Sequence, residues 1–219
     1  MRSQNKQSSM LTWPIIRKGL AYIFSGRLYV KNGHLPPPEH AIPDDLIGVC
    51  VASAADAGMD DYVISQLRLL GINQVRLDFS YGDLESFNAR FLQRLVDEKF
   101  QITLHLLQPF SHAKNMASPT EQASWKAFLI AVLECFGSQV KRVEIGTTIN
   151  RKRWAGYSVE GFLQAWAIAY HEVKQRGITL AGPNLTDFEP IYNIGILSML
   201  KAKNQLPDIH TDNLFSERV

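Results

Sequence analysis

Polar side chains that can hydrogen-bond a ligand gather near the ends of several short apolar segments in this sequence. They are Arg76, Asp78, His105, Thr147, Thr148, Asn150, Asn184, His210, Asp212 and Asn213. A ring of donors and acceptors of this kind suits a polyhydroxylated ligand, because each hydroxyl group of a sugar needs directional hydrogen bonds. The spacing therefore predicts a carbohydrate-binding site.

Some of these residues also have an interpretation that needs no ligand. Arg76 and Asp78 are two positions apart and could form a buried ion pair inside the fold. His105 lies within an apolar segment, and such a histidine is commonly a core residue whose ring nitrogens are satisfied by protein groups. Both interpretations stay open from the sequence alone.

The segments that would position these side chains alternate between strand and helix from residue 46 onward. Strands are expected at 46–51, 74–80, 101–107, 141–147 and 178–181 and from residue 207, the first of them buried, with amphipathic helices between them. Alternating βα units form a parallel sheet with right-handed crossovers. An open doubly wound sheet and a closed barrel both fit this order. The absence of G-x-G-x-x-G after the first strand and the polar strand ends favour the barrel.

The predicted fold is thus α/β, an incomplete (β/α)8 TIM barrel of about six βα units with an N-terminal amphipathic helix. The chain has 219 residues, whereas a complete barrel typically needs about 250. We expect residues 1–45 to be an amphipathic leader and a Pro-rich linker. Residues 46–219 would then form a barrel that is truncated before strand 7.

The segment 143–150, Val-Glu-Ile-Gly-Thr-Thr-Ile-Asn, adds a motif to this pattern. It resembles the strand-4 motif W-E-I-G-N-E-P-N of retaining, clan A-like glycoside hydrolases of the xylosidase and cellulase kind. Arg76 in V-R-L-D-F resembles the strand-2 arginine of that clan, and His105 in T-L-H-L its strand-3 histidine. Gly182-Pro183-Asn184 resembles the turn after strand 5, and His210 the strand-6 histidine. The resemblance implies a barrel that acts on O-glycosidic bonds of an oligosaccharide or a polysaccharide.

The departures from this motif imply that the chain is inactive as it stands. The family has its acid/base glutamate where this chain has Thr148, and its sugar-contacting asparagine where this chain has Thr147. Retaining hydrolysis needs two carboxyl groups about 5 Å apart, and the family carries the second on strand 7, which is expected to be missing. Glu144 would lie roughly 13 Å deeper than Thr148 by strand rise. We expect Glu144 to be structural and paired with a basic group.

Composition and charge exclude several other classes of function. The formal net charge is +2, from 23 basic and 21 acidic residues, so nucleic acid is not an expected partner. Cys50 and Cys135 have apolar neighbours and are expected to be free, buried thiols. No C-x-x-C or H-E-x-x-H spacing occurs, so neither a metal nor another cofactor is expected.

The N-terminal segment 11–30 is amphipathic but does not resemble a signal peptide. Arg17 and Lys18 interrupt its apolar residues, and no small-residue cleavage site follows. Its apolar residues recur at helical spacing: Trp13, Ile16, Leu20 and Phe24. This pattern fits either a peripheral membrane anchor or a leader packed against the barrel. The first alternative would place a cytoplasmic protein at the inner membrane face.

Three functional hypotheses remain open from the sequence. The first is a glycoside-hydrolase-like barrel, and the second is a carbohydrate-binding barrel or scaffold without activity in cell-envelope glycan metabolism. The third, an unrelated lyase or phosphate-binding barrel, is disfavoured because no lysine ends a strand where a Schiff base could form. Unpaired sheet edges would in each case predict self-association.

Overall fold

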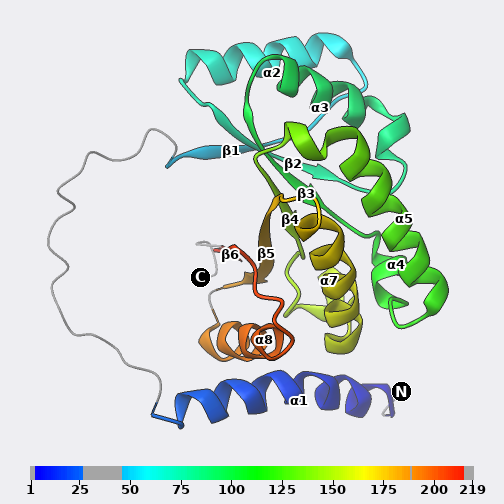
Figure 1. Cartoon of the computed structure of the whole chain (residues 1–219), viewed down its shortest axis with the longest axis vertical. Coiled ribbons are helices and arrows are strands. Elements are labelled where there is room, and N and C mark those ends of the chain that lie inside the picture. Colours follow the sequence, from blue (N-terminus) through cyan, green and yellow to red (C-terminus); the bar gives the residue numbers. More distant parts are fainter. Residues whose placement is uncertain (1–2, 27–45, 188, 215–219) are drawn as a thin grey trace, which may run out of the picture.

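The computed structural model describes residues 3–26, 46–187 and 189–214. Six parallel strands form one sheet in the order of the sequence. They are β1 (Gly48–Val51), β2 (Gln74–Phe79), β3 (Gln101–Leu106), β4 (Arg142–Ile145), β5 (Thr179–Thr186) and β6 (Ile209–Asn213). The sheet is curled and its helices lie along one side (Figure 1), so the described residues form a half-barrel of the TIM type, as predicted.

Eight α-helices are present in the described part of the chain. They are α1 (Ser3–Ile23), α2 (Ala57–Leu69), α3 (Phe87–Asp97), α4 (Phe110–Lys114), α5 (Pro119–Phe136), α6 (Lys152–Ala155), α7 (Val159–Lys174) and α8 (Pro190–Ala202). Two of these helices begin with a side-chain cap: Ser118 accepts a hydrogen bond from the Glu121 N–H, and Ser158 accepts one from the Gly161 N–H. Each cap satisfies one of the free N–H groups at a helix start.

The strands divide their side chains between two faces because successive Cβ atoms point to opposite sides. On β2, Val75, Leu77 and Phe79 are buried against the helices. Arg76 and Asp78 alternate with them and therefore face the inner side of the curl. The same alternation runs through β3 and β4, so the outer face is an apolar core and the inner face is largely polar.

Strand β1 corrects the prediction of a buried first strand. Leu46, Ile47 and Val49 are all exposed, because within the described residues β1 pairs only with β2. The two cysteines are also corrected. Cys50 and Cys135 are free, as expected, but both are exposed.

Strand β5 extends further than predicted, and strand β6 begins later than predicted. β5 continues past Ala181 through the cis Gly182–Pro183 peptide to Thr186. The segment 182–184 is therefore part of a strand and is not a turn. β6 begins at Ile209, two residues later than predicted, and contains His210, Asp212 and Asn213.

Helix α1 packs against α8 and lies at the end of the helix layer opposite α2 (Figure 1). Two glycines allow this contact. A Cβ at Gly19 would lie 2.4 Å from the Ile191 carbonyl oxygen, and a Cβ at Gly195 would lie 2.3 Å from the Ile15 carbonyl oxygen. The backbones of the two helices therefore touch where side chains are missing.

The expected linker lies within residues 27–45, outside the described residues, so the division at residue 45 stays a prediction. Within the described residues, no helix has the length and the apolar character needed to cross a membrane.

Candidate functional site

Two adjacent rungs of the sheet supply the polar side chains of the inner face. In the first rung, Arg76 of β2 is paired in register with Thr103 of β3. In the second, Asp78 is paired with His105, which is paired with Glu144 of β4. Parallel register thus brings residues that are far apart in the sequence into one row.

Arg76 links the two rungs. Its Nε donates to Glu144 Oε2 at 2.5 Å, and its Nη1 donates to Asp78 Oδ1 at 3.0 Å. Its Nη2 lies 2.5 Å from His105 Nδ1. The expected ion pair between Arg76 and Asp78 is therefore present, and Arg76 is the basic partner that was predicted for Glu144.

His105 is buried and fixed by contacts at both ring nitrogens. Nε2 lies 2.7 Å from the Gly146 carbonyl oxygen and must donate to it. Nδ1 lies 2.8 Å from Asp78 Oδ1 as well as close to Arg76. A neutral ring accepts from Arg76, whereas a protonated ring donates to Asp78, so the ring has a satisfied partner in either form.

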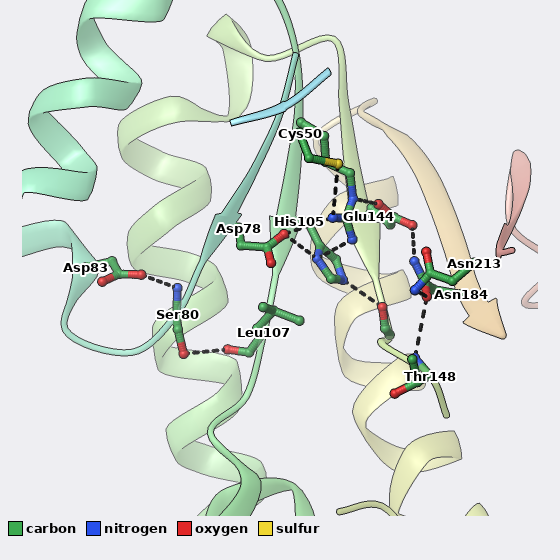
Figure 2. Close-up of polar contacts among 12 residues, drawn as sticks. Cys50, Asp78, Ser80, Asp83, His105, Leu107, Glu144, Thr148, Asn184 and Asn213 are labelled. Carbon is green, nitrogen blue, oxygen red and sulfur yellow. Dashed lines mark hydrogen bonds and ion pairs between the residues drawn. The ribbon is translucent and has the colours of Figure 1, made fainter. Parts of the chain in front are cut away.

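A chain of hydrogen bonds continues from Glu144 across the next two strands (Figure 2). Asn184 of β5 donates from Nδ2 to Glu144 Oε1 at 2.7 Å. Its Oδ1 accepts from Asn213 Nδ2 of β6 at 2.6 Å and from the Thr148 N–H at 3.4 Å. The network therefore reaches from β2 to β6.

The network keeps its two carboxyl groups ionised. Burial alone would raise the pKa of Glu144, but attraction to His105 and Arg76 and hydrogen bonds from Arg76 and Asn184 lower it below its ordinary value. For Asp78, burial would likewise raise the pKa, but the hydrogen bond and the attraction to His105, together with Arg76, lower it. Both groups are thus charged acceptors at neutral pH, and neither has the raised pKa of a general acid.

A cavity of about 480 Å³ opens beside this network. Residues that line it include Cys50, Ser53, Arg76, Asp78, Phe87 and Asn88. The Asp78 side chain is 57% exposed, and Phe87 is 43% exposed. A charged acceptor, a guanidinium donor and an apolar ring are therefore available to a ligand in one place.

The loop after β4 holds the remaining residues of the predicted strand-4 motif. Gly146 has φ +99° and Thr148 has φ +43°, so the chain turns sharply at the end of the strand. Thr147 lies between them. Asn150 donates from Nδ2 to the Thr186 carbonyl oxygen and to Glu189, and its Oδ1 accepts from the Thr186 N–H. Asn150 thus fastens this loop to the end of β5.

His210 and Asp212 do not join the network. His210 Nε2 lies 2.6 Å from Asn193 Oδ1 of α8 and 3.5 Å from Asp212 Oδ2. The first contact is with helix α8 and the second stays within β6. Of the ten predicted residues, the structure brings together Arg76, Asp78, His105, Asn184 and Asn213, with Thr148 attached through its backbone.

Several residues beside the network were missed by the sequence analysis. Cys50 Sγ lies 3.8 Å from Arg76 Nη1, and Ser53 hydrogen-bonds Asn88. Phe87 and Asn88 lie at the start of α3 and belong to no sequence motif that would have indicated a site. Strand alternation could have indicated the face on which Cys50 lies, but its pairing with Arg76 depends on the register of β1 and β2.

No protein-family model and no curated protein matches the sequence. Among solved structures, L-ribulose 3-epimerase matches with a TM-score of 0.53 at 14% identity, over 77% of this chain and 59% of that one. The virulence factor SghA from Agrobacterium tumefaciens matches with 0.46 at 13%, over 66% and 48%. A family 39 glycoside hydrolase from the gut symbiont Bacteroides cellulosilyticus WH2 matches with 0.44 at 17%, over 64% and 31%.

At these identities the likeness is one of fold. The chain spans about half the length of SghA. A glycoside hydrolase and a sugar epimerase are both among the similar structures, and what the described residues share with them is the parallel half-barrel fold.

Proposed function

We propose that the inner face of this half-barrel binds a carbohydrate and that the described residues do not hydrolyse it. The observation that carries the proposal is the cavity of about 480 Å³ between β1, β2 and the start of α3, where Arg76, Asp78 and Phe87 converge. A polar, open inner face differs from the layers of branched apolar side chains that usually fill such a barrel.

The chemistry of these three side chains fits a sugar ring. An ionised carboxylate such as Asp78 accepts two hydroxyl hydrogen bonds, and a guanidinium such as Arg76 donates to hydroxyl oxygens. The exposed ring of Phe87 gives the apolar C–H face of a sugar a surface to pack against. Ser53 and Asn88 add neutral hydrogen-bonding groups to the same wall.

The ionised state of the acidic groups supports the proposed absence of hydrolysis. Glu144 is held ionised by Arg76 and Asn184, so it cannot protonate a leaving oxygen. Asp78 is also held ionised. Thr148, at the position of the acid/base in the resembling motif, offers a hydroxyl that does not ionise near neutral pH and so cannot serve as a general acid or base.

The decisive experiment is a titration of the purified chain with a panel of neutral and acidic oligosaccharides, in which NMR or calorimetry measures the binding. We expect saturable binding by at least one of them, and a loss of about tenfold in affinity for Phe87→Ala, from the packing of one aromatic ring. Tyr62→Ala is the matched control, since Tyr62 is an exposed aromatic residue on α2 that does not line the cavity.

Two results would overturn the proposal. Failure of every oligosaccharide to bind, or binding that Phe87→Ala and Asn88→Ala leave unchanged, would remove the assigned site. Release of new reducing ends from a bound oligosaccharide, at a rate above that of a buffer blank, would contradict the absence of hydrolysis.

A further inference from the structure

Helix α1 has two different faces, and only one of them is used by the fold. Ile15 and Gly19 are buried against α8. Trp13, Arg17, Leu20 and Phe24 recur at spacings of four, three and four residues and share another face; Phe24 directly follows the helix, and its N–H donates to the Leu20 carbonyl oxygen. At about 100° per residue, this second face is turned roughly 150° away from the Ile15–Gly19 face.

The outward face combines exposed aromatic rings with exposed cations. Trp13 is 57% exposed and Phe24 is 83% exposed. Arg17 and Lys18 are exposed as well. The sequence analysis placed the apolar stripe on Trp13, Ile16, Leu20 and Phe24. The structure shows that α8 instead packs against Ile15 and Gly19, which leaves much of that stripe uncovered by the described residues.

Basic and acidic residues are distributed unevenly along the chain. Residues 1–38 contain six basic residues (Arg2, Lys6, Arg17, Lys18, Arg27 and Lys31) and no aspartate or glutamate. The rest of the chain holds the other 17 basic residues and all 21 acidic ones, a formal net charge of −4. Positive charge is therefore concentrated in the sequence segment that contains this helix, and Arg17 and Lys18 lie on the helix itself.

We propose that the outward face of α1, defined by Trp13, Arg17, Leu20 and Phe24 and flanked by Lys18, docks on the surface of an anionic phospholipid bilayer. Helices that lie in a membrane interface place aromatic and aliphatic side chains at the acyl boundary and basic side chains among the headgroups. The two glycine contacts with α8 hold α1 on the half-barrel, so docking would bring the whole fold to the surface.

The experiment is sedimentation of the full chain with vesicles of phosphatidylglycerol mixed with phosphatidylcholine, and with vesicles of phosphatidylcholine alone. We expect binding to the anionic vesicles that weakens as salt is raised, and little binding to the neutral ones. The variant R17Q/K18Q should bind about 25-fold more weakly, since each basic residue near an anionic surface contributes a factor of about five. W13S/F24S should bind at least about tenfold more weakly, because less apolar surface is buried.

The chain contains a matched control on another element. Trp154 on α6 is 73% exposed and follows the exposed Lys152 and Arg153. The variants K152Q/R153Q and W154S should therefore leave vesicle binding unchanged. Circular dichroism spectra and melting curves that match those of the unmodified chain establish that each variant is folded.

The W154S protein also provides a spectroscopic test. Trp125 and Trp166 are fully buried, so Trp13 is its one exposed tryptophan among the described residues. Its emission should shift to shorter wavelength when anionic vesicles are added. Absence of both sedimentation and this shift would overturn the proposal. So would binding that K152Q/R153Q abolishes and R17Q/K18Q does not. A change from dimer to monomer in W13S/F24S, without lipid binding, would assign the face to a second copy of the chain.

Discussion

The two faces of the same curled sheet have opposite chemistry. On the outer face, Val75, Leu77 and Phe79 of β2 and the matching residues of the other strands pack against helices and are nearly inaccessible. On the inner face, Arg76 and Asp78 alternate with them and form a charged network. Because the two sets alternate along one strand, β2 contributes to a core and to a candidate binding site at the same time.

Because the two faces differ in this way, substitutions at adjacent residues of β2 can test stability and ligand binding separately. The outer face is expected to supply most of the free energy of folding through apolar burial. The inner network exchanges hydrogen bonds with water for hydrogen bonds with itself, and the net gain of such an exchange is small. The inner face can therefore keep polar groups for a ligand at limited cost, provided that each buried group has a partner.

The largest expected effect is on the outer face. Phe79→Ala should lower the free energy of unfolding by about 3–5 kcal/mol, the usual range for a fully buried phenylalanine. Phe79 is 0% exposed and meets the ring of Phe136 edge-on, with centroids 6.3 Å apart. Chemical denaturation measures the change. A loss below about 1 kcal/mol would mean that the core does not depend on this contact between β2 and α5.

A smaller effect is expected where the inner network is buried. Arg76→Met leaves Glu144, whose side chain is only 4% exposed, without its cationic partner. We expect a loss of about 2 kcal/mol at neutral pH, less than for a fully buried pair because Arg76 is partly exposed to solvent. Arg94→Met, which removes a surface ion pair with Asp61, is the matched control and should change stability much less.

The pH dependence of this loss has a definite sign. The folded-state pKa of Glu144 lies below its ordinary value of 4.5, so its ion pair stabilises the fold above that pH. The stabilisation is lost as pH falls through the folded-state pKa. The difference between the unmodified chain and Arg76→Met should therefore shrink below about pH 4.5. A difference that stays constant down to pH 3 would show that Arg76 acts through packing instead of charge.

The sequence predicts the outer face better than the inner one. The order of strands and helices depends on local hydrophobic patterning, and the structure confirms it. The residue that pairs with Glu144, in contrast, cannot be identified from its neighbours in the sequence. Arg76 is 68 residues away, and only the register of three strands brings the two together.

The errors in strand limits also have physical causes. Gly182 and Pro183 usually interrupt a strand, but the register with β4 ends at Ala181. Beyond that point the missing proline N–H costs no ladder bond with β4. A Cβ at Gly182 would lie 2.5 Å from the Ile145 carbonyl oxygen, so close packing requires glycine at this position. The end of the register at Ala181 and the close approach of Gly182 to Ile145 both depend on where β4 lies, which the sequence alone does not reveal.

The smallest effect on stability is expected for Asp78→Asn, next to Phe79 on β2. The Asp78 side chain is 57% exposed, so its ion pair with Arg76 should contribute less than about 1 kcal/mol, as in other solvent-accessible pairs. Because its pKa is lowered by His105 and Arg76, this small contribution should disappear as pH falls below the ordinary value of 3.8. Oligosaccharide affinity should nevertheless fall about tenfold, since the amide replaces a charged acceptor. If Asp78→Asn instead destabilised the fold as much as Phe79→Ala and left binding intact, the inner face would be a second core and the division between the two faces would be wrong.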